Sequence, residues 1–179
     1  MKPRPQAPLP TPRAVIFDWD NTLVESWSAI FGALNHCLIQ MGQAPWSDSE
    51  ARLRVRASLR DAFPKLFGDR WPEAREIYLN EFKRRHLGEV KTMPEAEAFL
   101  QELRGRKILA AVVSNKTGSL LRSESAHLGW DGYFHRLIGA QDTPADKPDP
   151  GVVKAALAGS GMEPSDAVCF IGDAAIDMD

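Results

Sequence analysis

Cysteine is scarce in this chain, and its scarcity excludes some classes of protein. The 179 residues include two cysteines, Cys37 and Cys169, which lie far apart in the sequence. This arrangement predicts neither a disulfide framework nor a zinc site. Because Cys169 lies inside an apolar run, we expect it to be a small, buried hydrophobic residue.

Long apolar runs are missing as well. No stretch approaches the length of about 20 residues that a transmembrane helix needs. Residues 1–12 contain five prolines and lack the apolar segment of a signal peptide, so they are predicted to form an extended, poorly ordered tail. The sequence therefore predicts a cytoplasmic protein with no membrane partner.

Neither sign of charge is in large excess. The formal net charge of −2 gives no general reason to expect nucleic acid as a partner. The four histidines show no metal-ligand spacing, and no role is assigned to them: His36, His86, His127 and His135. A hydrophobic content of 44% is enough for a core, and the length suits one domain with an insertion.

Two aspartates, Asp18 and Asp20, follow the apolar run at residues 14–17. A continuously apolar run predicts a strand that is buried on both faces. Residues two apart in an extended chain project to the same side, so the two carboxylates would repel each other. One of them would be driven neutral unless a cation lies between them.

Polar groups also follow other predicted strands and stand in one loop between them. They are Ser114 and Asn115 after residues 108–113, Lys147 in a proline-flanked loop, and Gly172, Asp173 and Asp177 after residues 167–171. The glycine is expected to let the backbone turn and approach a ligand closely. Because open α/β sheets bind ligands at the carboxyl ends of their strands, these groups are candidates for one site.

At these residues the chain resembles the haloacid dehalogenase superfamily, and within it the phosphoglycolate phosphatase branch with a helical cap. The motifs, in order, are Asp18-Trp19-Asp20-Asn21-Thr22-Leu23, Ser114-Asn115, Lys147, and Gly172-Asp173 with Asp177. Asn21 departs from the glycine that is more usual there, but asparagine tolerates positive φ, so we expect the turn to survive. The resemblance covers nearly everything after the first dozen residues.

The resemblance implies a Mg²⁺-dependent phosphomonoester hydrolase that acts on a small phosphorylated metabolite. Asp18 would be the nucleophile that forms an aspartyl-phosphate, and Asp20 would be the general acid and then the general base. Lys147 would neutralise Asp18 and the phosphoryl oxygens. Ser114 and Asn115 would bind the phosphate where a strand meets the start of a helix, or simply cap that helix.

Mg²⁺ would be held by Asp18, Asp173 and the backbone carbonyl of Asp20, because this ion prefers oxygen ligands. Asp177 would support the metal or be an exposed helix acid. Two alternatives stay open: a phosphomutase of the β-phosphoglucomutase type, and a non-catalytic protein that binds phosphate or metal. The sequence indicates neither the substrate nor the oligomeric state.

The predicted fold is a doubly wound parallel α/β sheet with an inserted all-helical cap. The core would comprise residues 13–23 and 91–179, and the cap residues 24–90. Cap helices are expected at about 26–41, 48–63 and 72–87, with Pro64 and Gly68 ending the second. In the core, Thr92 is expected to cap a helix whose Phe99 faces the sheet.

Two further expectations concern the second cap helix and the end of the chain. Arg52, Arg56 and Arg60 are spaced to share one helix face, which could receive a substrate carboxylate but is more typical of a solvated surface. The chain stops at Asp179, where the helix that bears Asp177 has barely begun. We therefore expect a C-terminus that is truncated relative to the family.

Overall fold

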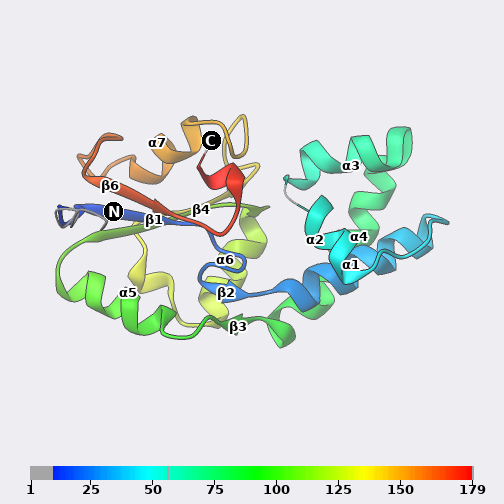
Figure 1. The fold of residues 1–179 in the computed structure, drawn as a ribbon, viewed down its shortest axis with the longest axis horizontal. Coiled ribbons are helices and arrows are strands. Elements are labelled where there is room, and N and C mark those ends of the chain that lie inside the picture. Colours follow the sequence, from blue (N-terminus) through cyan, green and yellow to red (C-terminus); the bar gives the residue numbers. More distant parts are fainter. Residues whose placement is uncertain (1–9, 56, 179) are drawn as a thin grey trace, which may run out of the picture.

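A computed structural model describes residues 10–55 and 57–178. Its centre is a sheet of four parallel strands in the order β5–β4–β1–β6 (Figure 1). The strands are β1 (Ala14–Phe17), β4 (Leu109–Thr117), β5 (Leu137–Ala140) and β6 (Val168–Ile171). The apolar residues of β1 are at most 2% exposed, because strands flank it on both sides and helices cover both faces.

Helices cover both faces of the sheet, which confirms the doubly wound prediction. α5 (Ala96–Gly105) and α6 (Gly118–His127) pack on the face that carries Val15 and Phe17. α7 (Gly151–Leu157) packs on the opposite face, against Ile16. Each connection between consecutive parallel strands of the sheet contains at least one helix, as parallel pairing requires a long crossover. None of the described helices is both long enough and apolar enough to cross a bilayer.

A helical insertion follows the first strand and lies beyond the carboxyl ends of the sheet (Figure 1). It comprises α1 (Trp27–Gln40), α2 (Asp48–Arg54), α3 (Leu59–Phe67), the 3-10 turn η1 (Gly68–Arg70) and α4 (Trp71–Glu89). It has its own apolar core, built mainly from α1, α3 and α4. Apolar residues at helical spacing produce this core, since they place one face of each helix inward.

The insertion is not helical to its ends. β2 (Val24–Glu25) pairs antiparallel with β3 (Lys91–Thr92), so a short ribbon carries the chain out of the sheet and back. The expectation of an all-helical segment over residues 24–90 was therefore wrong at its start. The expected helix cap at Thr92 was wrong too, because this residue belongs to the ribbon and α5 begins at Ala96.

The predicted helix at residues 48–63 is two helices. Ser47 and Glu50 form a capping box that starts α2, which ends at Arg54, and α3 begins after Ser58. Pro64 lies inside α3 and does not end it: the helix loses the backbone hydrogen bond that this residue cannot donate, and it continues to Phe67. Arg52 and Arg60 consequently lie on different helices, and Arg56 lies outside the described residues.

Two apolar side chains, one on the edge strand β6 and one on α5, are more exposed than expected. Cys169 is exposed, not buried, because β6 is an edge strand and no described helix packs over this position. Phe99 is 40% exposed, although its ring edge contacts Phe17 with a centroid separation of 6.0 Å. For Cys169, the apolar character of the surrounding sequence did not show that its strand lies at the edge of the sheet.

Candidate active site

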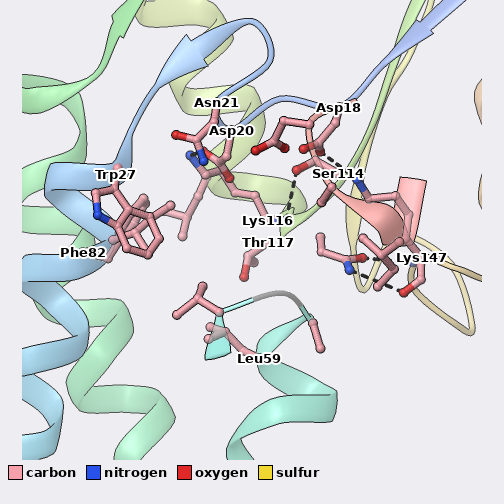
Figure 2. A pocket seen from close by; sticks show the side chains of 18 of the residues that line it. Asp18, Asp20, Asn21, Trp27, Leu59, Phe82, Ser114, Lys116, Thr117 and Lys147 are labelled. Atoms are coloured by element: carbon pink, nitrogen blue, oxygen red, sulfur yellow. Dashed lines mark hydrogen bonds and ion pairs between the residues drawn. The ribbon is translucent and has the colours of Figure 1, made fainter. Parts of the chain in front are cut away.

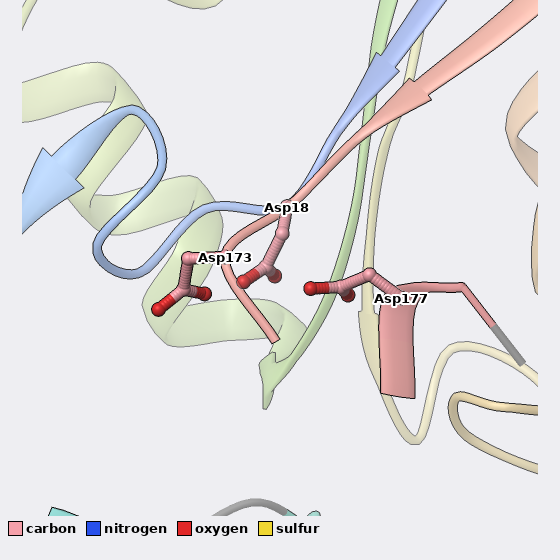
Figure 3. A group of neighbouring side chains, drawn as sticks. All are labelled: Asp18, Asp173 and Asp177. Carbon is pink, nitrogen blue, oxygen red and sulfur yellow. The ribbon is translucent and has the colours of Figure 1, made fainter. Parts of the chain in front are cut away.

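The neighbouring strands β1 and β6 bring three carboxylates together. Asp18 follows β1 directly, is 7% exposed, and donates its backbone N–H to the carbonyl of Ile171 at 2.8 Å. Asp173 follows β6, and Asp177 lies in the 3-10 turn η3 (Ala175–Asp177). Carboxylate oxygens of the three aspartates lie within 4.8 Å of one another and point into one space (Figure 3).

Gly172 makes room for Asp177. A Cβ atom built on Gly172 would overlap the Asp177 carboxylate, so only glycine leaves that carboxylate in place. Asp177 Oδ2 also accepts a hydrogen bond from the backbone N–H of Ala174 at 3.0 Å. The glycine was expected to serve a turn or a close approach to a ligand; here it serves the position of a neighbouring acid.

Lys147 connects two of these acids. Its Nζ lies 2.8 Å from Asp18 Oδ1 and 2.6 Å from Asp177 Oδ1, and the residue is 5% exposed. An ammonium group this deeply buried requires paired carboxylates, because an unpaired charge in the interior is costly. The lysine loop and the ends of β1 and β6 thus form one ionic cluster.

The cluster carries more negative than positive charge. Burial raises the pKa of Asp18 to about 6, against the opposing pull of Lys147, and Asp20 and Asp177 add to the rise. Burial and the charge of Asp177 also raise the pKa of Asp173. A divalent cation would relieve this repulsion, and a set of hard carboxylate oxygens fits Mg²⁺.

Asp20 stands at the start of the loop that leaves the sheet. Its Oδ1 accepts a hydrogen bond from Ser26 Oγ and forms an ion pair with Lys116 Nζ at 2.6 Å. Asn21 follows with a φ of 59°, and its N–H closes the turn on the carbonyl of Val24 at 2.6 Å. The turn therefore survives with asparagine in the place of glycine, as the sequence predicts.

Ser114 and Asn115 lie within a strand rather than at the start of a helix. β4 continues through Thr117, with an irregular register against β5 between Val113 and Thr117, and α6 starts at Gly118. The alternative, in which the two residues simply cap a helix, was therefore wrong, and phosphate binding stays a prediction. Such irregularities redirect side chains beside active sites. Ser114 is buried, and its Oγ accepts from the backbone N–H of Lys116 at 3.2 Å.

Asn115 contacts the lysine loop. Its Oδ1 accepts from the backbone N–H of Lys147 at 3.0 Å, and its Nδ2 donates to the carbonyl of the same residue at 3.4 Å. Both ends of the side-chain amide are engaged by one residue. This geometry favours a supporting role for Asn115, which fixes the backbone from which Lys147 reaches Asp18.

Sequence reasoning missed four residues around Asp20. Lys116, Glu124 and Trp19 are buried and hydrogen-bonded together, and His86, which received no role, joins them from α4. A signal was available for Glu124, because it follows the buried Leu120 and Leu121 at helical spacing on α6. A carboxylate on an apolar face indicates a buried partner.

A cavity of about 160 Å³ opens between the carboxylates and the helical insertion. Figure 2 shows Asp18, Ser114 and Lys147 on one side and Trp27, Phe82 and Leu59 on the insertion side. The two described arginines that were expected to share a helix face have other contacts. Arg52 pairs with Asp48, and Arg60 donates from Nε to Asp146 at 3.0 Å.

Comparison with known proteins agrees with this geometry. Residues 15–179 match the family described as haloacid dehalogenase-like hydrolase. A phosphoglycolate phosphatase of Aquifex aeolicus is 29% identical over 93% of this chain and 78% of its own length. One from Caulobacter vibrioides is 30% identical, with 91% and 72% covered. The structure of a haloacid dehalogenase-like family hydrolase from Streptococcus pneumoniae superposes with a TM-score of 0.80 at 24% identity, covering 92% of this chain and 77% of that one.

Proposed function

The chain belongs to the haloacid dehalogenase-like hydrolase family, and on that premise we propose that it is a Mg²⁺-dependent phosphomonoester hydrolase that forms an aspartyl-phosphate. The observation that carries the proposal is the cluster at the cavity floor. It combines a buried carboxylate, Asp18, a buried ammonium, Lys147, and two further acids, Asp173 and Asp177.

Asp18 is the proposed nucleophile. It follows the central strand β1, and its backbone N–H is fixed by Ile171, so its position is set by the sheet rather than by a loop. Lys147 holds one carboxylate oxygen at 2.8 Å. Attack on phosphorus would form the aspartyl-phosphate and release the alcohol, and water would then hydrolyse the acyl phosphate.

Asp20 is the proposed acid and base. It is two residues beyond Asp18 and lines the same cavity, so its carboxyl group can reach the oxygen that leaves phosphorus. It would donate a proton to the departing alkoxide and later take one from the attacking water. Ser114, buried at the cavity wall, would hold a phosphoryl oxygen through its hydroxyl group.

Lys147 and the metal would together neutralise the negative charge of the site. A bound Mg²⁺ would be held by Asp18, Asp173 and the backbone carbonyl of Asp20, with support from Asp177, and it would neutralise negative charge on the transferring phosphoryl group. Lys147 compensates charge on Asp18 and Asp177 through its two ion pairs. Asn115 holds the Lys147 backbone in the required place.

The proposed substrate is a small phosphorylated metabolite. The cavity of about 160 Å³ has room for a compact molecule, and the similar proteins from Aquifex aeolicus and Caulobacter vibrioides are named phosphoglycolate phosphatases. Phosphoglycolate is therefore the first compound to test. The helical insertion forms the wall opposite the carboxylates, so differences in selectivity within the family would arise there.

A phosphomonoester panel assayed with and without Mg²⁺ tests the proposal. Chelation should abolish turnover, and millimolar Mg²⁺ should raise the melting temperature because a ligand that binds the folded state stabilises it. Asp18→Asn should abolish turnover while the circular dichroism spectrum stays unchanged. Turnover that resists chelation, together with a melting temperature that Mg²⁺ does not move, would remove the metal from the mechanism.

A further inference from the structure

Glu124 on α6 has no exposed surface and is surrounded by donors from three segments. Its Oε2 accepts from Trp19 Nε1 at 2.7 Å and from Lys116 Nζ at 2.6 Å. Its Oε1 lies 2.9 Å from Nδ1 of His86 on α4. Because an ionised carboxylate only accepts hydrogen bonds, the imidazole must donate here.

Both members of the central ion pair are charged. Burial on its own would lower the pKa of Lys116, but the carboxylates of Asp20 and Glu124 hold that pKa above its ordinary value. Burial would raise the pKa of Glu124, but hydrogen bonds from His86, Lys116 and Trp19 hold it below its usual range. A fully buried ion pair adds little stability compared with apolar packing, so its presence calls for another reason.

The second contact of Lys116 supplies that reason. Its Nζ lies 2.6 Å from Asp20 Oδ1, and the hydroxyl of Ser26 donates to the same oxygen. Within residues 10–55 and 57–178, no hydrogen bond reaches Asp20 Oδ2, and Asp20 lines the cavity. One carboxylate oxygen is thus fixed, and the other is left for the proton that the leaving group requires.

We propose that Lys116 and Glu124 are positioning residues for the acid Asp20, and that His86 ties this pair to the helical insertion. Glu124 fixes the ammonium of Lys116, the ammonium fixes Oδ1 of Asp20, and Oδ2 then presents its proton to the departing oxygen. The inference rests on the proposed phosphomonoester hydrolysis. It adds that alignment of the acid depends on the contact between α4 and α6.

A positioning role and a purely structural role differ in one measurable respect. If the pair only stabilises the fold, its loss slows every substrate equally. If it aligns the acid, its loss slows esters whose leaving oxygen needs a proton and spares those whose leaving oxygen does not. The dependence of kcat/KM on the leaving group therefore separates the two roles.

The test compares 2-phenylethyl phosphate, whose alkoxide needs a proton, with 4-nitrophenyl phosphate, whose phenolate does not. For Lys116→Met, and for the isosteric Glu124→Gln, we expect kcat/KM to fall about 30-fold on the alkyl ester and less than about 3-fold on the aryl ester. His86→Leu should show the same selectivity with a smaller loss. Lys154→Met, on the exposed surface of α7, is the control and should change neither value.

A second arm repeats Lys116→Met in an Asp20→Asn background. If Lys116 acts through Asp20, it should have little further effect there, because residues that act as a unit are not additive. The same loss in both backgrounds, or equal losses on both esters, would overturn the inference and leave the phosphatase proposal intact.

Two further results must be distinguished from these: an inactive wild-type chain and a Lys116→Met variant that does not fold. A wild-type chain that with Mg²⁺ hydrolyses neither these two esters nor phosphoglycolate nor any other member of the phosphomonoester panel would overturn the proposed function, and this inference with it. Should Lys116→Met lose its folded circular dichroism spectrum, Glu124→Gln decides the question, because it keeps the shape of the side chain and removes its charge.

Discussion

The carboxylate of Asp177 occupies the space that a side chain on Gly172 would fill. Gly172 follows β6 immediately, and Asp177 lies in the turn that returns toward Asp18. The absence of one methyl group thus permits the approach of an acid to Lys147 and to the other carboxylates.

Gly172→Ala is therefore expected to move Asp177 and to weaken Mg²⁺ binding by about 10-fold or more, since loss of a residue that supports a metal site costs on this scale. Titration of the melting temperature with Mg²⁺ measures the effect. Gly105→Ala is the matched control, because a Cβ there meets no atom within 4 Å. Equal Mg²⁺ affinity in the two variants would contradict the role assigned to Gly172.

The raised pKa of Asp18 predicts a pH-dependent stability in the absence of metal. Because its folded pKa of about 6 lies above the ordinary value of 3.8, this group favours the folded state below about pH 4, and that contribution is lost as the pH rises through 6. Asp18→Asn removes the ionisation. Without metal, its free energy of unfolding should exceed that of the wild type by about 3 kcal/mol at pH 7 and by little at pH 4.

Urea unfolding in the presence of a chelator, at both pH values, measures this difference. Asp166→Asn, an exposed aspartate, serves as the control and should show no such trend. A stability difference for Asp18→Asn that stays constant from pH 4 to pH 7 would show that burial does not raise the pKa of this carboxyl group.

Asn115 is expected to act through Lys147. Asn115→Ala removes both hydrogen bonds to the lysine backbone, which should cost about 1–2 kcal/mol of stability and lower kcat about 10-fold. Asn35 offers a matched control, because it makes the same pair of contacts with the backbone of Trp46 inside the insertion. Asn35→Ala should lose similar stability and keep its kcat. Similar kcat losses in both variants would indicate a general effect of destabilisation.

Arg60 connects the insertion to the loop before Lys147. It bonds the Asp146 carboxylate, which has no exposed side-chain surface, and donates from Nη1 to the carbonyl of Pro144 at 2.9 Å. Arg60→Ala leaves that carboxylate with the backbone N–H of Gln141 at 3.0 Å. We expect faster hydrogen exchange in α3 and a KM that rises a few-fold, because the insertion is held less firmly.

Arg70→Ala is the control for this experiment. Its ion pair with Glu73 is exposed and lies within the insertion, away from the cavity, so its loss should leave both exchange in α3 and KM unchanged. An Arg60→Ala variant that behaves like Arg70→Ala would show that the contact with Asp146 is dispensable for substrate binding.

The sequence predicted the sheet because its strands are short apolar runs that end in polar groups. The ends of β1 and β6 could be assigned to one site, since parallel strands place their carboxyl ends at one edge. The exposure of Cys169 could not be predicted, because it depends on which strand lies at the edge of the sheet. The break between α2 and α3 was missed because helical spacing persists across it.

Some residues of the candidate site could likewise be predicted from the sequence, and others could not. Asp18, Asp20, Lys147 and Asp173 were found because each has a recognisable place at a strand end or in a loop. Glu124 and His86 were not, because their significance comes from contacts between distant segments: α6 meets α4 only in the folded chain. A glutamate on an apolar helix face indicated that a partner must exist, but not which one.

The ribbon of β2 and β3 has a consequence for how such a chain can vary. It places the entry and the exit of the insertion side by side, with Val24 opposite Thr92 and Glu25 opposite Lys91. A segment whose ends adjoin can be lengthened, shortened or exchanged without altering the register of the strands that carry the acids. The residues proposed to break the phosphate ester and those proposed to select its alcohol can therefore be inherited and engineered as separate parts.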